Sequence, residues 1–285
     1  TTLTRTVSES SNADAAIVLT GSATVFIGAT AADIPALYAE SYDGTSGLPV
    51  ATGSTNAVAI GRAYADGTDS FAAAIANNTS SYGATGDESV AMGRFAKATG
   101  SRSIALGGNA TATALFATAL TNSYASGGDS FAAGKDSASA SYGAQATSSI
   151  AIGKQAKATG AYGTAIGEAT QATASNSVCM GYYSQATAQG AVAIGYDAQA
   201  TAGKSYSFGL KVRNAIQNTF RFAGGHFSAA GDAQSGIYIM RSDTTDATAE
   251  ALTTTKTAAS TDNQVILPNN SAYFFSGTII AREQA

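Results

Sequence analysis

Ile150-Ala151-Ile152-Gly153 begins a short phrase that returns every fourteen residues. The later copies are Thr164-Ala165-Ile166-Gly167, Val178-Cys179-Met180-Gly181, Val192-Ala193-Ile194-Gly195 and Tyr206-Ser207-Phe208-Gly209. Large–small–large alternation is typical of a strand with one buried face, and the glycine after it indicates a sharp turn. A second alternating run, such as Ala156-Lys157-Ala158, lies between the phrases. Fourteen residues is too short for a helical repeat, so each unit predicts one coil of a parallel β-solenoid.

The phrase can be followed back toward the N-terminus with irregular spacing. We place the strand entries at Val58, Phe71, Tyr82, Val90, Ile104, Thr118, Phe131, Tyr142, Ile150, Thr164, Val178, Val192 and Tyr206. The spacings are 13, 11, 8, 14 and 14, then the same five again, then 14 and 14. Because the irregularity recurs with a period of 60, residues 61–120 and 121–180 indicate an internal duplication. Thirteen coils spaced by about 4.8 Å predict a stack of roughly 60 Å.

A coil of two short strands encloses little space. We expect its interior to hold the first large residue of each phrase, such as Ile150 or Val192, with alanines from the second strand. The other large residue, such as Ile152, also needs burial, because positions i and i+2 share one face of a strand. So thin a roll would be marginal alone, and shared burial around a three-fold axis predicts an obligate homotrimer. A monomeric solenoid with one wide core is the alternative.

The composition argues against several classes of partner. Of 285 residues only 15 are Lys or Arg and 19 are Asp or Glu, and the formal net charge is −4. This balance gives no electrostatic footprint for nucleic acid or for an anionic membrane. No apolar run is long enough to span a bilayer, and no signal peptide is recognisable at the start. We therefore expect no nucleic-acid partner and no membrane insertion.

The sequence divides into four segments. Residues 1–56 lack the phrase and predict a β-rich cap or attachment segment, because the ends of a solenoid need atypical units. Residues 57–209 form the repeats, and residues 210–225 predict a more charged neck. Residues 226–285 predict a C-terminal β module that continues beyond the last residue. Its expected strands are Ser235–Arg241, Gln264–Leu267 and Tyr273–Arg282.

Residues that could carry catalysis are sparse. His226 is the single histidine, and no motif links it to Ser228 or Asp232. Cys179 takes a position that holds alanine in sister coils, which predicts a small buried residue rather than a nucleophile. No pair of carboxylates with the arrangement of a glycosidase site is recognisable. We therefore predict no enzyme activity, no catalytic residue and no cofactor.

Two aspartate pairs, Asp66 with Asp69 and Asp243 with Asp246, are the best candidates for a cation. Their oxygen ligands are too few for a Ca²⁺ site, and aspartates so placed are typical of turn caps. We predict no metal site.

Tyrosines beside the turns are the best candidates for surface recognition of a carbohydrate. They are Tyr162, Tyr182, Tyr183 and Tyr196. The alternative is that these rings pack against a neighbouring coil or subunit.

The repeats from Val58 to Gly209 resemble the head repeats of trimeric autotransporter adhesins, whose motif is Ser-Val-Ala-Ile-Gly followed by alternating alanines. The matching copies are Ser89-Val90-Ala91-Met92-Gly93, Ser103-Ile104-Ala105-Leu106-Gly107 and Ser149-Ile150-Ala151-Ile152-Gly153. For about half of the chain the resemblance implies a trimer of left-handed parallel β-rolls. The handedness comes from the resemblance and not from the periodicity.

The C-terminal segment resembles a module that is common in bacteriophage fibres and other virion proteins. The residues concerned are Gly231–Arg241, Thr244–Thr248 and Leu267–Ser271. This resemblance implies a homotrimeric tail fibre of a virion, which would bind other virion proteins at one end and a host surface glycan or protein at the other. The alternatives are a capsid-attached head fibre, the head of a bacterial trimeric autotransporter adhesin at the cell surface, and the non-catalytic part of a glycan-cleaving tailspike.

Overall fold

The computed structural model describes residues 38–39, 50–51, 56–61, 63–74, 81–134, 140–244, 246, 248–267 and 272–280. All of them belong to the unit that runs from Leu37 to Ala285. Of the expected N-terminal cap or attachment segment, only residues 38–39, 50–51 and 56 are described, so that expectation lies largely outside them.

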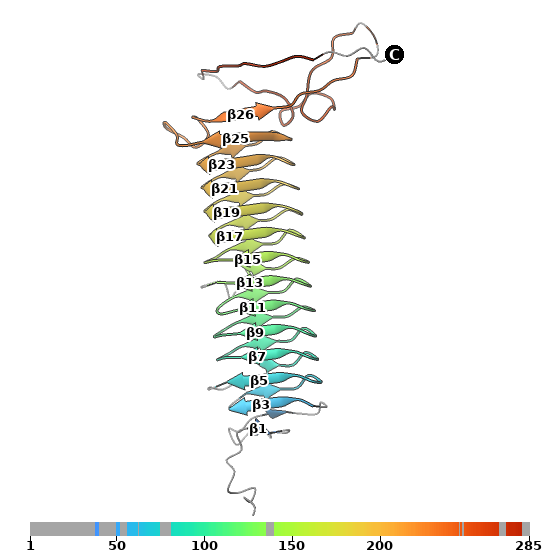
Figure 1. Cartoon of the computed structure of the whole chain (residues 1–285), viewed down its shortest axis with the longest axis vertical. Helices are drawn as coiled ribbons and strands as arrows, with labels where there is room; N and C mark the ends of the chain where they lie inside the picture. Colours follow the sequence, from blue (N-terminus) through green and yellow to red (C-terminus); the bar gives the residue numbers. More distant parts are fainter. Residues whose placement is uncertain are drawn as a thin grey trace, which may run out of the picture. The chain divides into compact units, whose positions relative to one another are not determined.

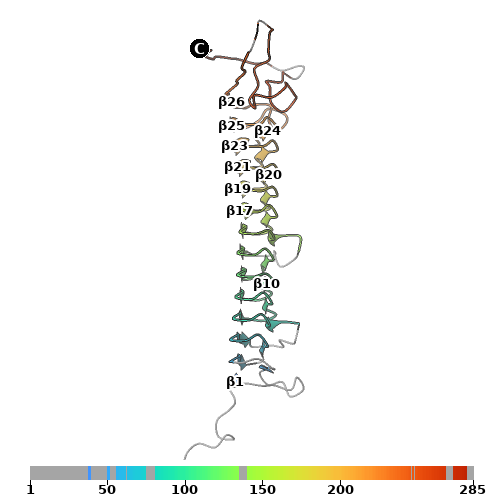
Figure 2. The same cartoon turned by 90° about the vertical axis from the view of Figure 1, so that its right-hand side faces the viewer.

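Two sheets build an all-β solenoid, and the described residues contain no helix (Figures 1 and 2). The first sheet consists of β1 (Tyr38–Ala39), β3 (Val58–Gly61), β5 (Phe71–Ala74), β7 (Val90–Met92), β9 (Ile104–Leu106), β11 (Thr118–Leu120), β13 (Phe131–Ala133), β15 (Ile150–Ile152), β17 (Thr164–Glu168), β19 (Val178–Tyr182), β21 (Val192–Tyr196), β23 (Tyr206–Leu210), β25 (Thr219–Ala223) and β26 (Ser235–Tyr238). The second consists of β2 (Val50–Ala51), β4 (Tyr64–Ala65), β6 (Gly83–Ala84), β8 (Lys97–Ala98), β10 (Thr111–Ala112), β12 (Tyr124–Ala125), β14 (Gly143–Ala144), β16 (Lys157–Ala158), β18 (Gln171–Ala172), β20 (Gln185–Ala186), β22 (Gln199–Ala200) and β24 (Arg213–Asn214).

Each coil contributes one strand to each sheet, and equivalent residues of successive coils lie opposite one another. Ile150 pairs with Thr164, and Thr164 pairs with Val178, always in parallel. The turns continue the ladder: the amide of Tyr162 donates to the carbonyl of Thr147 at 2.9 Å. The parallel β-solenoid with fourteen-residue coils is therefore confirmed.

The number of coils differs from the expected thirteen. From β3 to β25 the described part of the first sheet has twelve parallel strands, which make eleven steps. Tyr82 and Tyr142 begin no strand of that sheet; they precede β6 and β14 of the second sheet. The expected spacings of 11 and 8 are thus one coil of 19 residues, with a longer connection between its two strands. Eleven steps give a stack of roughly 50 Å rather than 60 Å.

The core consists of small side chains, which reverses the expectation that the large residue of each phrase points inward. Ala151, Ala165 and Cys179, the middle residues of the phrase, are at most 2% exposed. Ile150 and Ile152 are each 37% exposed. Alternation does place both large residues on one face, but this is the outer face, because the narrow gap between two short strands favours small side chains such as those of alanine, serine and cysteine.

The outer faces of the two sheets differ in chemistry. On the first sheet, two columns of mostly apolar side chains run along the roll, and we call them the apolar columns. They comprise Val58, Ile60, Phe71, Ala73, Val90, Met92, Ile104, Leu106, Thr118, Leu120, Phe131, Ala133, Ile150, Ile152, Thr164, Ile166, Val178, Met180, Val192, Ile194, Tyr206, Phe208, Phe220 and Phe222. The second sheet instead presents a partly exposed polar column that includes Lys157, Gln171, Gln185 and Gln199.

The roll is closed at its C-terminal end by larger side chains. Residues of the expected neck form β24 and β25, which continue both sheets in parallel. Asn214 is buried where earlier coils have alanine, and its amide donates to the carbonyls of Tyr206 and Thr219 at 3.1 and 3.0 Å. β26 then pairs with β25 in the antiparallel direction, which ends the parallel ladder.

Most strands expected after residue 226 are absent from the described part of the chain. Of Ser235–Arg241 only Ser235–Tyr238 is a strand, and Arg241 makes an isolated bridge to Thr253. Residues 264–267 and 272–280 have no regular structure, although Tyr273-Phe274-Phe275 and Ile279-Ile280 are apolar runs. Apolar composition predicted a strand there, but a strand also needs a partner edge.

We expect Gly167→Ala to destabilise the roll. Gly167 has φ = +126°, and a Cβ there would lie 1.9 Å from the carbonyl oxygen of Gly181 in the next coil. Strain and overlap with backbone should cost at least about 2 kcal/mol, seen as a lower midpoint of thermal unfolding. In the control Gly225→Ala a Cβ meets nothing within 4 Å, and the midpoint should stay unchanged. Equal midpoints for the two variants would contradict the close stacking of coils at Gly167.

Candidate functional site

Three of the four candidate tyrosines form one cluster, which we call the tyrosine patch: Tyr182, Tyr183 and Tyr196. Tyr182 and Tyr196 are paired residues of adjacent coils, with ring centroids 5.1 Å apart. Tyr183 follows in the turn, and its ring meets that of Tyr182 edge-on at 4.4 Å and 82°. Tyr183 and Tyr196 are each 49% exposed, while Tyr182 is half-buried. The parallel register thus brings together rings that are up to fourteen residues apart in the chain.

Tyr162 lies elsewhere on the roll. It is in the opposite turn, which follows the second sheet, two residues before β17. It is 60% exposed and has φ = +59°, close to the φ of +55° at Tyr183. The structure therefore splits the expected four-residue set into a patch of three and a separate single ring.

Ion pairs flank the tyrosine patch on both sides. In the preceding coils, Lys154 pairs with Glu168 at 3.0 Å, and Glu168 is the residue opposite Tyr182. Asp197, which directly follows Tyr196, pairs with Arg213 of the following coil at 2.8 Å. Partial burial raises the pKa of Tyr182, and its hydrogen bond to Tyr183 adds to the rise. The patch is therefore a neutral aromatic surface with a fixed carboxylate at either end.

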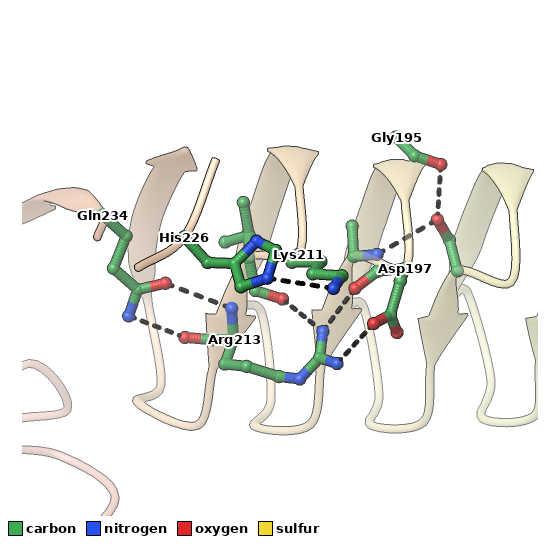
Figure 3. Close-up of polar contacts among 9 residues, drawn as sticks. Gly195, Asp197, Lys211, Arg213, His226 and Gln234 are labelled. Atoms are coloured by element: carbon green, nitrogen blue, oxygen red, sulfur yellow. Dashed lines mark hydrogen bonds and ion pairs between the residues drawn. The ribbon is translucent and has the colours of Figure 1, made fainter. Parts of the chain in front are cut away.

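Arg213 also joins the roll to the segment that follows it (Figure 3). Besides Asp197, its guanidinium donates to the carbonyl of Val212 at 3.1 Å. Its backbone amide donates to the side chain of Gln234 at 3.1 Å, and the Gln234 amide donates to the Arg213 carbonyl at 3.0 Å. Sequence reasoning missed this junction, although an arginine in a column of glutamines was a usable signal.

The environment of His226 does not favour catalysis. Lys211 Nζ lies 3.1 Å from His226 Nε2, as Figure 3 shows. Asp232 accepts hydrogen bonds from the backbone amides of Ala229, Ser228 and Phe227, and these bonds lower its pKa. Its carboxylate thus organises the loop backbone, so it does not orient the imidazole as a triad carboxylate would.

The aspartate pairs behave as turn caps and ion-pair partners. Asp69 accepts a hydrogen bond from Asn56 at 2.8 Å, Asp246 accepts one from the amide of Thr248 at 2.7 Å, and Asp243 pairs with Lys256. Within the described part of the chain, no three His, Cys, Asp or Glu side chains gather closely enough to hold a metal ion. Nor does that part contain a helix long and apolar enough to cross a membrane.

Cys179 is a buried core residue, as its position in the phrase predicted. Its side chain is fully buried, and burial raises the pKa of its thiol to about 12. Because the thiolate is the reactive form, this environment suppresses its chemistry.

Six segments, in two overlapping groups, match the family model described as the YadA head domain repeat (2 copies). They are residues 84–110, 98–120, 144–168, 158–184, 172–198 and 186–205. Together they cover residues 84–120 and 144–205, about a third of the chain. The roll is thus similar to trimeric autotransporter adhesin heads, which supports an adhesin-like structural role at an exposed surface. This match gives no indication of a bacteriophage origin. A comparison with curated proteins finds no match.

The burial of Cys179 predicts that its thiol does not react with thiol reagents in the native protein. With a pKa of about 12 and no exposed surface, Cys179 should not react with an aromatic disulfide reagent at pH 8 over an hour. In guanidinium chloride one thiol per chain should react within minutes, because its pKa returns to about 8.5. Fast labelling of the native protein would show that the core opens at this coil.

Proposed function

We propose that the chain is a non-enzymatic, homotrimeric fibre segment that serves adhesion, with the roll as its rigid spacer. The observation that supports this proposal most directly is the chemical difference between the two outer faces of one thin roll. The apolar columns cover the first sheet from β3 to β25, whereas the outer column of the second sheet is mainly polar, with Tyr64, Gly83, Tyr124 and Gly143 as exceptions.

The apolar columns form the subunit interface in this proposal. Seven of their aliphatic side chains are more than a third exposed in the single chain: Val58, Ile60, Met92, Ile104, Ile150, Ile152 and Met180. Burying the remaining surface of one such side chain contributes on the order of 1 kcal/mol. Over two columns and eleven coils, this gain is large enough to offset the several kcal/mol that association costs. Three copies that turn these columns toward a common axis remove them all from water.

A structural role fits the distribution of chemical groups. In the described part of the chain, three ion pairs join neighbouring coils, such as Glu88 with Arg102 at 2.8 Å, and other carboxylates cap turns, as Asp246 does. A cavity of about 320 Å³ is lined by Arg241, Asp243, Glu250 and Lys256 together with alanine, serine and threonine. Two of its lining side chains, Asp243 and Lys256, form an ion pair with each other.

For the location of the fibre, we propose a bacteriophage tail, with residues 1–56 binding other virion proteins. The resemblance of residues 231–271 to virion modules supports this choice. A bacterial surface adhesin is the second candidate, and the match to head domain repeats favours it at least as strongly. Immunogold labelling of phage particles and of whole host cells separates them: label on tails supports the fibre, and label on cells in phage-free cultures supports the adhesin.

Ile152→Glu should disrupt the trimer, whereas Gln171→Glu should not. Both variants add one carboxylate to the outer face of a strand, but Ile152 lies in an apolar column and Gln171 in the polar column of the second sheet. Three charges forced together in an apolar interface are strongly unfavourable. Sedimentation velocity should show three chain masses for the parent and for Gln171→Glu, and a dissociated species for Ile152→Glu. A monomeric parent chain, or a trimeric Ile152→Glu, would overturn the proposed interface.

A further inference from the structure

The tyrosine patch departs from the pattern of the roll at the positions that it occupies. Tyr182 and Tyr196 are the fourth residues after the strand entries Val178 and Val192. In other described coils the same position holds Arg94, Gly108, Asn122, Lys154, Glu168 and Leu210, and the next position holds Phe95, Asn109, Ser123, Gln155, Ala169, Asp197 and Lys211. Most of these residues are polar or small. The two large apolar ones are Leu210, which lies opposite Tyr196, and Phe95, whose ring centroid lies 5.1 Å from that of Tyr82.

This repeat pattern indicates whether the tyrosine patch lies inside or outside the proposed subunit interface. Equivalent positions of a uniform roll share one environment in the assembly. Charged side chains such as Arg94 and Lys154, both exposed, would be costly in a buried subunit interface. The tyrosines of the next coils therefore face solvent in the trimer as well, beside the apolar columns and not within them.

We propose that the tyrosine patch is a glycan-binding site, present three times on the fibre. The apolar face of a sugar ring stacks on exposed aromatic rings, and Tyr183 and Tyr196 each expose about half of their surface. Tyrosine suits such contacts because it combines a rigid, large apolar surface with a hydroxyl group.

The flanking carboxylates supply acceptors for sugar hydroxyls. Glu168 and Asp197 are each held by one ion pair, to Lys154 and Arg213. A carboxylate has about four lone-pair sites, so each retains acceptor capacity while its position is fixed. A patch that had to bind an apolar peptide would gain nothing from these fixed charges, which favours a polyhydroxylated ligand.

The glycan site adds a ligand class to the proposed adhesive function. It rests on that proposal in one respect, because only a homotrimer carries the site three times. Three identical weak sites on one rigid body raise the avidity for a repetitive surface polysaccharide through effective concentration.

The test uses the full chain on an array of bacterial O-antigen, capsular and teichoic acid polysaccharides, followed by surface plasmon resonance with the glycan that binds best. Tyr183→Ala and Tyr196→Ala should each weaken binding at least tenfold. Tyr196→Phe, which keeps the ring, should weaken it less than threefold. The matched control is Tyr162→Ala, because Tyr162 and Tyr183 are both exposed turn residues with nearly the same positive φ; its affinity should stay within twofold of the parent.

Several results would overturn the glycan site. These are no binding to any glycan on the array, unchanged binding by Tyr196→Ala, or an equal loss in Tyr162→Ala. Sedimentation of every variant separates this outcome from failure of the trimer. A monomeric parent chain that still loses glycan binding in Tyr196→Ala would contradict the trimer and keep the site.

Discussion

The narrow gap between two short strands determines nearly everything else in this structure. Two strands of two to five residues, joined by tight turns, leave room for alanine, serine or cysteine and for little more. A core of such residues buries little apolar surface per coil, so it cannot by itself offset the conformational entropy of ordering the chain. The larger apolar residues therefore lie outside, on one sheet. In the proposed homotrimer the other copies cover them, which makes folding stability and association one requirement.

That requirement divides the coil into positions with separate tasks. Inward positions must be small, and the apolar columns are committed to association. The glycine after each phrase has a left-handed φ and stacks against the next coil, as at Gly181 and Gly195. Only the turn residues, the last residues of the longer first-sheet strands such as Tyr182 and Tyr196, and the outer face of the second sheet remain free to vary without disturbing the stack. A recognition site must arise at those positions.

The sequence allowed the repeat, the parallel strands and the fourteen-residue coil to be predicted, because alternation and period are local signals. The prediction that Ile150 rather than Ala151 points into the core was wrong, because alternation shows which residues share a face but not which face is inside. The coil entries proposed at Tyr82 and Tyr142 were wrong for a related reason: an aromatic residue before Gly-Ala resembles a strand of the first sheet. The clustering of Tyr182 with Tyr196 depends on register, whereas the separation of Tyr162 depends on which of the two turns it occupies.

The last coil shows how a repeat of this kind can end. At its inward positions alanine and serine give way to Val212, Asn214, Ile216 and Thr219, all buried. The Asn214 side chain accepts hydrogen bonds from the Ile216 amide and the Thr219 hydroxyl, and donates two others. A larger core residue in a middle coil would force the neighbouring coils apart, but at the end it fills the opening that an absent next coil would leave. The small-residue rule that allows the roll to lengthen by duplication is therefore broken mainly where lengthening stops; Thr170 is a buried exception in a middle coil.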